Sequence, residues 1–167
     1  MAGTGAEEIE YFALRRGASG ETYIHSPDEV LVVALDAHGA VALIVEPSPA
    51  FDEEVLVLPG GTVDPGELGP ATANRELQEE IGLRAARLDD LGELRAWSKY
   101  LSTRSHVYLA RDLTASWLKG DEAYEIRVEW TPLDAFEELI VSGRLLDARV
   151  IAALLLARRA LAAEHAG

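Results

Sequence analysis

The chain has 167 residues, of which 49% are hydrophobic and 26% are charged. This length and composition favour one folded domain with a single hydrophobic core and exclude general disorder. The 29 acidic residues outnumber the 15 basic residues and give a formal net charge of −14, which would repel the phosphates of DNA or RNA. A nucleic-acid polymer is therefore not an expected partner.

The sequence contains no cysteine. This excludes a disulfide framework, a thiolate metal site and a cysteine nucleophile, and it favours a reducing cytoplasm. The first twelve residues lack the charged and apolar pattern of an export signal, and no apolar stretch is long enough to span a bilayer. We expect a cytoplasmic protein with no membrane partner.

The first half of the chain favours strands. Residues 1–7 are expected to be flexible, and two β-favouring runs around a glycine-containing turn at 17–20 predict an N-terminal hairpin over residues 8–27. Two apolar runs, 29–37 and 41–47, are separated by a short connection and predict a second, more buried hairpin. Residues 28–167 are expected to form the main domain.

The second half mixes helices and strands. A short strand from residue 55 is ended by Pro59 and Gly60, and the glycine-rich stretch up to Gly69 is expected to be a loop. A helix is predicted from Pro70 to Ile81, ended by Gly82. Strands are expected at 84–97, 105–113 and 125–133, and helices at 134–143 and 145–164. The last helix places apolar residues at helical spacing, which predicts core packing of Leu146, Val150, Ala153, Leu154 and Ala157. The pattern is that of an α/β fold.

The predicted helix at 70–81 carries three glutamates on one face. Residues three and four apart share a face, so Glu76, Glu79 and Glu80 project together. Like charges at this spacing cost about 0.2–0.5 kcal/mol per pair, and Arg75 offsets only part of this repulsion. A solvated acidic surface is one interpretation, and a cation site is the other.

The preceding loop favours the cation site. Gly60, Gly61 and Gly66 permit close approaches that side chains would block, so backbone carbonyl oxygens can lie beside the carboxylates. Oxygen ligands of both kinds are those that Mg²⁺ and Mn²⁺ prefer. We therefore predict a divalent metal site between loop and helix.

The spacing of these residues resembles the Nudix box. Gly61 is followed after five residues by Glu67 and after seven more by the run Arg75 to Leu83, and every defined position of the box matches. The resemblance implies a Nudix hydrolase: an α/β/α sandwich with a central mixed β-sheet that cleaves diphosphate linkages of nucleoside diphosphates. It also implies Mg²⁺ or Mn²⁺ as cofactor, with two or three ions when substrate is bound.

The resemblance assigns roles by position. Glu76, Glu79 and Glu80 are the implied metal ligands, together with the backbone carbonyl of Gly60. Glu79 and Glu80 are also implied to be catalytic, and Arg75 is expected to orient a glutamate. Glu67 is expected to brace the loop against the helix or to lie in the outer part of the metal site.

Outside the box, the chain resembles the ADP-ribose pyrophosphatase branch of the family, in which an N-terminal strand pair is commonly exchanged between two subunits. This implies a homodimer, with Tyr11 and Phe12 as interface candidates. The acidic segment 121–125 occupies the place of a mobile loop with a catalytic glutamate, which aligns with Glu122. Glu125 is the second choice, and a solvated turn without a catalytic role is the alternative.

The chain departs from that branch at two places. Ser98 and Lys99 occupy the region where the branch usually has a proline, and residues 46–51 replace a Gln-Tyr-Arg element. The substrate contacts predicted instead are stacking on aromatic rings and charge contacts to phosphate, and the residues are Trp97, Lys99, Tyr100 and Arg104. Packing in a sheet or a subunit interface is the alternative role for the aromatic residues.

The leading hypothesis is hydrolysis of a nucleoside diphosphate sugar, with ADP-ribose as the first candidate, to a nucleoside monophosphate and a sugar phosphate. One alternative is hydrolysis of nucleoside triphosphates or dinucleoside polyphosphates. A non-catalytic nucleotide sensor is a further alternative, but the chain keeps every glutamate of the box.

Overall fold

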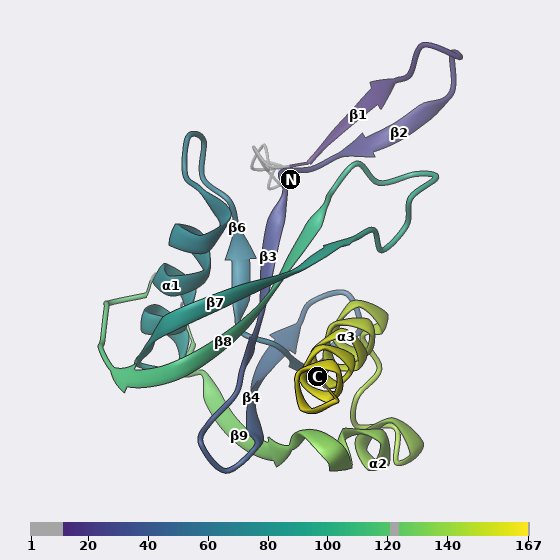
Figure 1. The fold of residues 1–167 in the computed structure, drawn as a ribbon. Helices are drawn as coiled ribbons and strands as arrows, with labels where there is room; N and C mark the ends of the chain where they lie inside the picture. The colour runs from purple at the N-terminus through teal and green to yellow at the C-terminus, as the bar shows by residue number, and fades with distance from the viewer. Residues whose placement is uncertain (1–11, 121–123, 167) are drawn as a thin grey trace, which may run out of the picture.

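The computed structural model describes residues 12–120 and 124–166. Strands β1 (Ala13–Arg16) and β2 (Thr22–His25) pair antiparallel, which confirms the predicted N-terminal hairpin. Figure 1 shows this hairpin projecting from the rest of the structure. The predicted flexible segment 1–7 and the interface candidate Tyr11 lie outside the described residues.

A mixed four-stranded sheet has the order β6-β3-β8-β7. Strand β3 (Glu29–Ala34) pairs antiparallel with β6 (Gly60–Thr62) and parallel with β8 (Ser105–Ala115), and β8 pairs antiparallel with β7 (Leu83–Leu94). The predicted mixed sheet is confirmed, and β3 lies inside it with a neighbour on each edge.

A separate antiparallel sheet has the order β5-β4-β9, formed by β5 (Glu53–Val57), β4 (Ala40–Ser48) and β9 (Arg127–Pro132). The predicted pairing of the two early apolar runs as a hairpin is therefore wrong, because β3 and β4 lie in different sheets and share only the isolated bridge Leu35–Val41. The reason is that each strand already has hydrogen-bonded neighbours on both of its edges.

Strand β6 lies where the sequence predicted a loop. The Pro59 carbonyl accepts the N–H of Val32 at 2.8 Å, so the chain continues past the proline as a partner of β3. A Cβ atom on Gly60 would collide with the backbone carbonyl oxygen of Val30. Glycine is needed at position 60 because the backbones of β6 and β3 approach closely, and not because the chain forms a flexible loop there.

Two helices cover opposite faces of the mixed sheet (Figure 1). On one face, Val32 of β3 packs in a buried cluster with Leu77 of α1 (Gly69–Glu80). On the other, Val33 packs in a second cluster with Leu154 of α3 (Ala148–His165). Successive strand residues point to opposite faces, so these two clusters establish the predicted α/β/α sandwich.

The C-terminal part of the chain supplies the 3-10 helix η1 (Leu133–Ala135), α2 (Phe136–Val141) and α3. The prediction that Leu146 packs in the core is wrong, because Leu146 precedes α3 and is 68% exposed, whereas Leu145 is fully buried. Within the part of the chain that the structure describes, no helix is both long and apolar enough to cross a membrane.

Asp147 fixes where α3 begins. Its carboxylate accepts the backbone N–H of Arg149 at 2.8 Å and that of Val150 at 3.3 Å. Burial would raise the pKa of Asp147, but the hydrogen bonds and charge of Arg149 outweigh this and lower the pKa below its usual value. The ionised side chain is therefore a stable N-cap. Because α3 begins only after Asp147, Leu146 lies outside the helix.

Candidate active site

The glutamates of α1 are brought against strand β6. Glu76 and Glu80 are both only 6% exposed. One carboxylate oxygen of Glu80 accepts the backbone N–H of Gly60 at 2.9 Å. The carboxylate of Glu76 lies so close to Gly61 that a Cβ atom there would collide with it. Gly61 is therefore required for strand and helix to meet at this point, whereas Gly60 contributes its backbone N–H.

Arg75 connects three carboxylates. Its guanidinium donates to Glu67 at 3.3 and 3.2 Å, to Glu76 at 2.8 Å and to Glu79 at 3.0 Å. It also donates to the carbonyl oxygen of Thr62, at 3.2 Å. One positive charge thus holds the loop, the strand and the helix together, and the contact with Glu67 is the brace that the resemblance implied.

Arg75 and Glu67 each stabilise the charged form of the other. Burial would lower the pKa of Arg75, but its hydrogen bond to Glu67 and the charge of Glu76 raise it above the usual value. The hydrogen bond from Arg75 in turn lowers the pKa of Glu67. Arg75 therefore remains positive and Glu67 negative at neutral pH, which keeps the ion pair between loop and helix intact.

The donor set suits a hard divalent cation, because three carboxylates lie within one and a half helical turns beside the Gly60 peptide. Gly60 lies opposite Leu31 in the β3–β6 pair, and the hydrogen bond between the strands is made by the next pair, from the N–H of Val32 to the carbonyl of Pro59. In an antiparallel ladder such pairs alternate, so the N–H and the carbonyl of Gly60 both point away from β3. Within residues 12–120 and 124–166, no three acidic or histidine side chains are already grouped around one ion position. The glutamates instead contact Arg75 and Gly60.

The two candidates for a general base lie in the connection between β8 and β9. Glu122 lies outside the described residues. Glu125 is described, is exposed and precedes β9 by two positions. Next to it, the hydroxyl of Tyr124 donates to a carboxylate oxygen of Glu46 in β4 at 3.3 Å. This contact ties the end of the connection to the antiparallel sheet, and the assignment of the base stays a prediction.

The substrate contacts predicted at 97–104 lie in the connection between β7 and β8, which extends on the side of the hairpin and away from α1 in Figure 1. The rings of Trp97 and Tyr100 form an edge contact with centroids 4.9 Å apart, and the Lys99 ammonium lies 5.2 Å from the Tyr100 ring centre. The N–H of Arg104 donates to Asp28 at 3.0 Å.

These aromatic residues contact the hairpin of the same chain. The Tyr100 carbonyl accepts the N–H of Ile24 at 2.7 Å, and a small apolar cavity of about 200 Å³ separates the two segments. That cavity is lined by Leu14, Thr22, Tyr23, Ile24, Trp97 and Tyr100. The structure thus brings Trp97, Lys99 and Tyr100 together and places Arg104 beside Asp28, and the connection that carries all four extends away from the glutamates of α1 (Figure 1).

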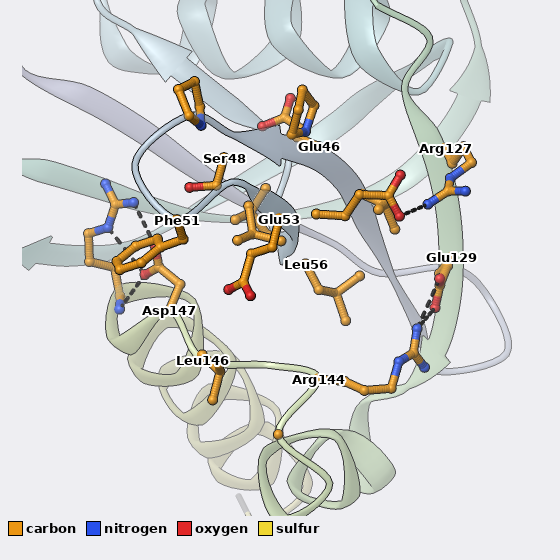
Figure 2. Close-up of a pocket in the computed structure, with 18 residues that line it drawn as sticks. Glu46, Ser48, Phe51, Glu53, Leu56, Arg127, Glu129, Arg144, Leu146 and Asp147 are labelled. Atoms are coloured by element: carbon orange, nitrogen blue, oxygen red, sulfur yellow. Dashed lines mark hydrogen bonds and ion pairs between the residues drawn. The ribbon is translucent and has the colours of Figure 1, made fainter.

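The structure also contains a larger cavity of about 760 Å³ that the sequence does not predict (Figure 2). It lies between the β4–β5 hairpin and the connection from α2 to α3, and Leu56 on its wall belongs to the α3-side core cluster. Ion pairs line it: Arg127 with Glu54, Arg144 with Glu129, and Arg149 with Asp147. The departure at residues 46–51 was the signal for it, since Glu46, Ser48 and Phe51 also line this cavity.

Comparison with known proteins agrees with this geometry. The NUDIX domain model matches residues 25–154. The ADP compounds hydrolase NudE of Escherichia coli (strain K12) is 34% identical over 130 residues, which cover 77% of this chain and 68% of that protein. An ADP-ribose pyrophosphatase of Bacillus subtilis (strain 168) is 28% identical over 141 residues, 82% of this chain and 75% of that protein.

A solved structure has the same fold. A crystal structure described as that of an ADP compounds hydrolase superimposes with a TM-score of 0.79 at 28% identity, and the match covers 92% of this chain and 85% of that chain. The matched family segment contains the whole box together with Arg75 and its carboxylate partners. This chain therefore belongs to the Nudix hydrolase family.

Proposed function

We propose that the protein is a metal-dependent pyrophosphatase that hydrolyses the diphosphate linkage of a nucleoside diphosphate sugar, with ADP-ribose as the first candidate. The observation that carries this proposal is that Glu76 and Glu80 pack against the Gly60–Gly61 backbone, while Arg75 joins Glu79 to Glu76. The names of the E. coli and B. subtilis relatives, an ADP compounds hydrolase and an ADP-ribose pyrophosphatase, support the substrate class.

The residues of α1 would hold Mg²⁺ or Mn²⁺ through Glu76, Glu79 and Glu80, with the carbonyl of Gly60 as a further ligand. When bound, such ions neutralise diphosphate charge and lower the pKa of a coordinated water. Arg75 keeps Glu76 and Glu79 oriented through its hydrogen bonds. Glu122, or Glu125 in its place, takes the proton of the attacking water.

The proposed reaction is tested with a substrate panel. Purified protein with Mg²⁺ or Mn²⁺ is expected to convert ADP-ribose to AMP and ribose 5-phosphate at least about tenfold faster than it converts dATP or diadenosine tetraphosphate, since differential transition-state binding of about 1.4 kcal/mol suffices. Chromatography of the phosphate products gives the ratio, and EDTA is the control. Preference for a triphosphate would replace this substrate assignment, and tight ADP-ribose binding without turnover would favour a nucleotide sensor.

We also propose a cytoplasmic homodimer in which the hairpin at 8–27 contacts a second copy. All four residues of β1 are exposed, Phe12 is 60% exposed, and Leu14 is 77% exposed and lines the small cavity with Trp97. An apolar strip on a two-stranded edge is a surface that a partner chain can cover. The absence of cysteine supports the cytoplasm.

Sedimentation velocity tests the dimer. The wild-type protein is expected to sediment as a dimer, whereas Leu14→Glu is expected to shift it to a monomer because a buried unpaired carboxylate is costly. Val141→Glu is the matched control, since Val141 at the end of α2 is 90% exposed. A wild-type monomer, or a dimer that Leu14→Glu leaves intact, would contradict this interface.

A further inference from the structure

The segment that follows β8 crosses the C-terminal end of the glutamate helix. We call residues 116–118 the strap. The N–H of Ser116 donates to the Gly82 carbonyl at 3.0 Å, and the N–H of Leu118 donates to the Gln78 carbonyl at 3.1 Å. The last carbonyl groups of an α-helix have no partner within the helix. The strap therefore caps the end of α1 from a segment distant in the sequence.

Side chains reinforce this cap. The hydroxyl of Ser116 donates to the Gln78 side-chain oxygen at 2.7 Å, and the Gln78 amide donates back to the Asn74 carbonyl at 2.7 Å. The ring of Trp117 lies against Gly82, where an added Cβ atom would be 2.7 Å from ring atom Cε3. Since Trp117 is 71% exposed, burial in the core does not explain where its indole lies.

The hydrogen bonds of the strap flank two of the glutamates in the sequence. Glu79 and Glu80 lie between Gln78 and Gly82, the two residues whose carbonyl groups the strap caps. Gly82 has a φ of +67°, so the chain turns sharply away from the helix two residues after Glu80. Without the strap, the last turn of α1 would end in unpaired carbonyl groups, and such ends fray. The directions of Glu79 and Glu80 depend on this turn.

We propose that Gln78, Ser116 and Trp117 are positioning residues that hold Glu79 and Glu80 in the geometry needed for metal binding and hydrolysis. This inference rests on the proposed function of these glutamates as metal ligands. The three residues act through the helix end and do not touch the substrate. Groups that orient metal ligands typically contribute about 10- to 100-fold to metal affinity or activity, so the strap has an effect large enough to measure.

The test compares Trp117→Ala with Trp117→Phe. Trp117→Ala is expected to weaken Mn²⁺ binding, followed by electron paramagnetic resonance, and to lower kcat about 10- to 100-fold with KM nearly unchanged. Trp117→Phe keeps a ring against Gly82 and is expected to recover most of both quantities. Val141→Ala, at an exposed position on α2, is the control for loss of a surface apolar side chain and is expected to match the wild type.

A second variant separates positioning from folding. Gln78→Met keeps the length of the side chain but removes its hydrogen bonds to Ser116 and Asn74. It is expected to lower Mn²⁺ affinity and kcat in the same way as Trp117→Ala. This variant tests the proposal if Trp117→Ala does not fold. Mn²⁺ affinity and kcat within twofold of wild type in the folded variants would overturn the proposal, as would equal impairment in Trp117→Phe and Trp117→Ala. If the wild type hydrolyses no panel member, the proposed function fails and the Mn²⁺ titration alone tests the strap.

Discussion

Glu80→Gln is expected to lower kcat about a thousandfold or more while leaving the protein folded. Glu80 is only 6% exposed and accepts the Gly60 N–H at 2.9 Å. Glutamine has nearly the same volume and keeps a carbonyl oxygen for that hydrogen bond, so the contact between α1 and β6 survives. The lost negative charge removes a metal ligand, and Lewis-acid stabilisation of several kcal/mol corresponds to about three powers of ten in rate.

The measurement pairs steady-state hydrolysis of ADP-ribose with Mn²⁺ titration and thermal unfolding. Glu137→Gln is the matched control, because Glu137 on α2 forms an exposed ion pair with Arg158, and such pairs contribute little. We expect this control to keep wild-type kcat and Mn²⁺ affinity. Wild-type Mn²⁺ affinity in Glu80→Gln, with kcat reduced less than tenfold, would refute the role of Glu80 as a metal ligand.

The cluster of glutamates could be predicted from the sequence because it depends on local geometry. The spacing of Glu76, Glu79 and Glu80 fixes their common direction once the helix forms, and Pro70 and Gly82 mark the ends of that helix within one or two residues. The same local rule predicts the contact of Arg75 with Glu79, four residues on.

Pairing between distant strands could not be predicted in the same way. The apolar runs of β3 and β4 have the same pattern whether they pair with each other or with other strands, and the choice depends on β8 and β9 much later in the chain. The role of Gly60 as a strand residue likewise depends on its close contact with Val30, and the residue pattern around Gly60 does not indicate that contact.

The location of the predicted substrate-contact residues also depends on distant parts of the chain. The aromatic rings of Trp97 and Tyr100 suit stacking on a base, but their neighbours are set by the hairpin, whose Ile24 hydrogen-bonds to Tyr100. The sequence does not predict the strap because Trp117 has no periodic partner, and the φ of +67° at Gly82 accounts for glycine there without reference to Trp117. The type of these residues indicates which contacts they could make, but only the tertiary packing shows where they lie.

Gly60→Ala is expected to lower the free energy of unfolding by about 3 kcal/mol. The added methyl group would collide with the Val30 carbonyl, a backbone group held in the β3–β6 ladder, and overpacking of this kind costs about 1–3 kcal/mol. Any shift of β6 also lengthens the hydrogen bond from Gly60 to Glu80, and a hydrogen bond to a charged group contributes about 1.5–3 kcal/mol. Urea unfolding at neutral pH measures the difference.

Gly61→Ala is the informative comparison, because its obstacle is the carboxylate of Glu76 and not the backbone. A side chain can rotate away, so Gly61→Ala is expected to lose less stability than Gly60→Ala but to lose most of its Mn²⁺ affinity. Gly17→Ala is the control, since a Cβ atom there meets nothing closer than 3.6 Å. Equal unfolding free energies for Gly60→Ala and Gly17→Ala would contradict the close approach of β6 to β3. If β6 does lie this close to β3, the contrast between the two variants shows that Gly60 is needed for folding and that Gly61 is needed to leave space for the Glu76 carboxylate.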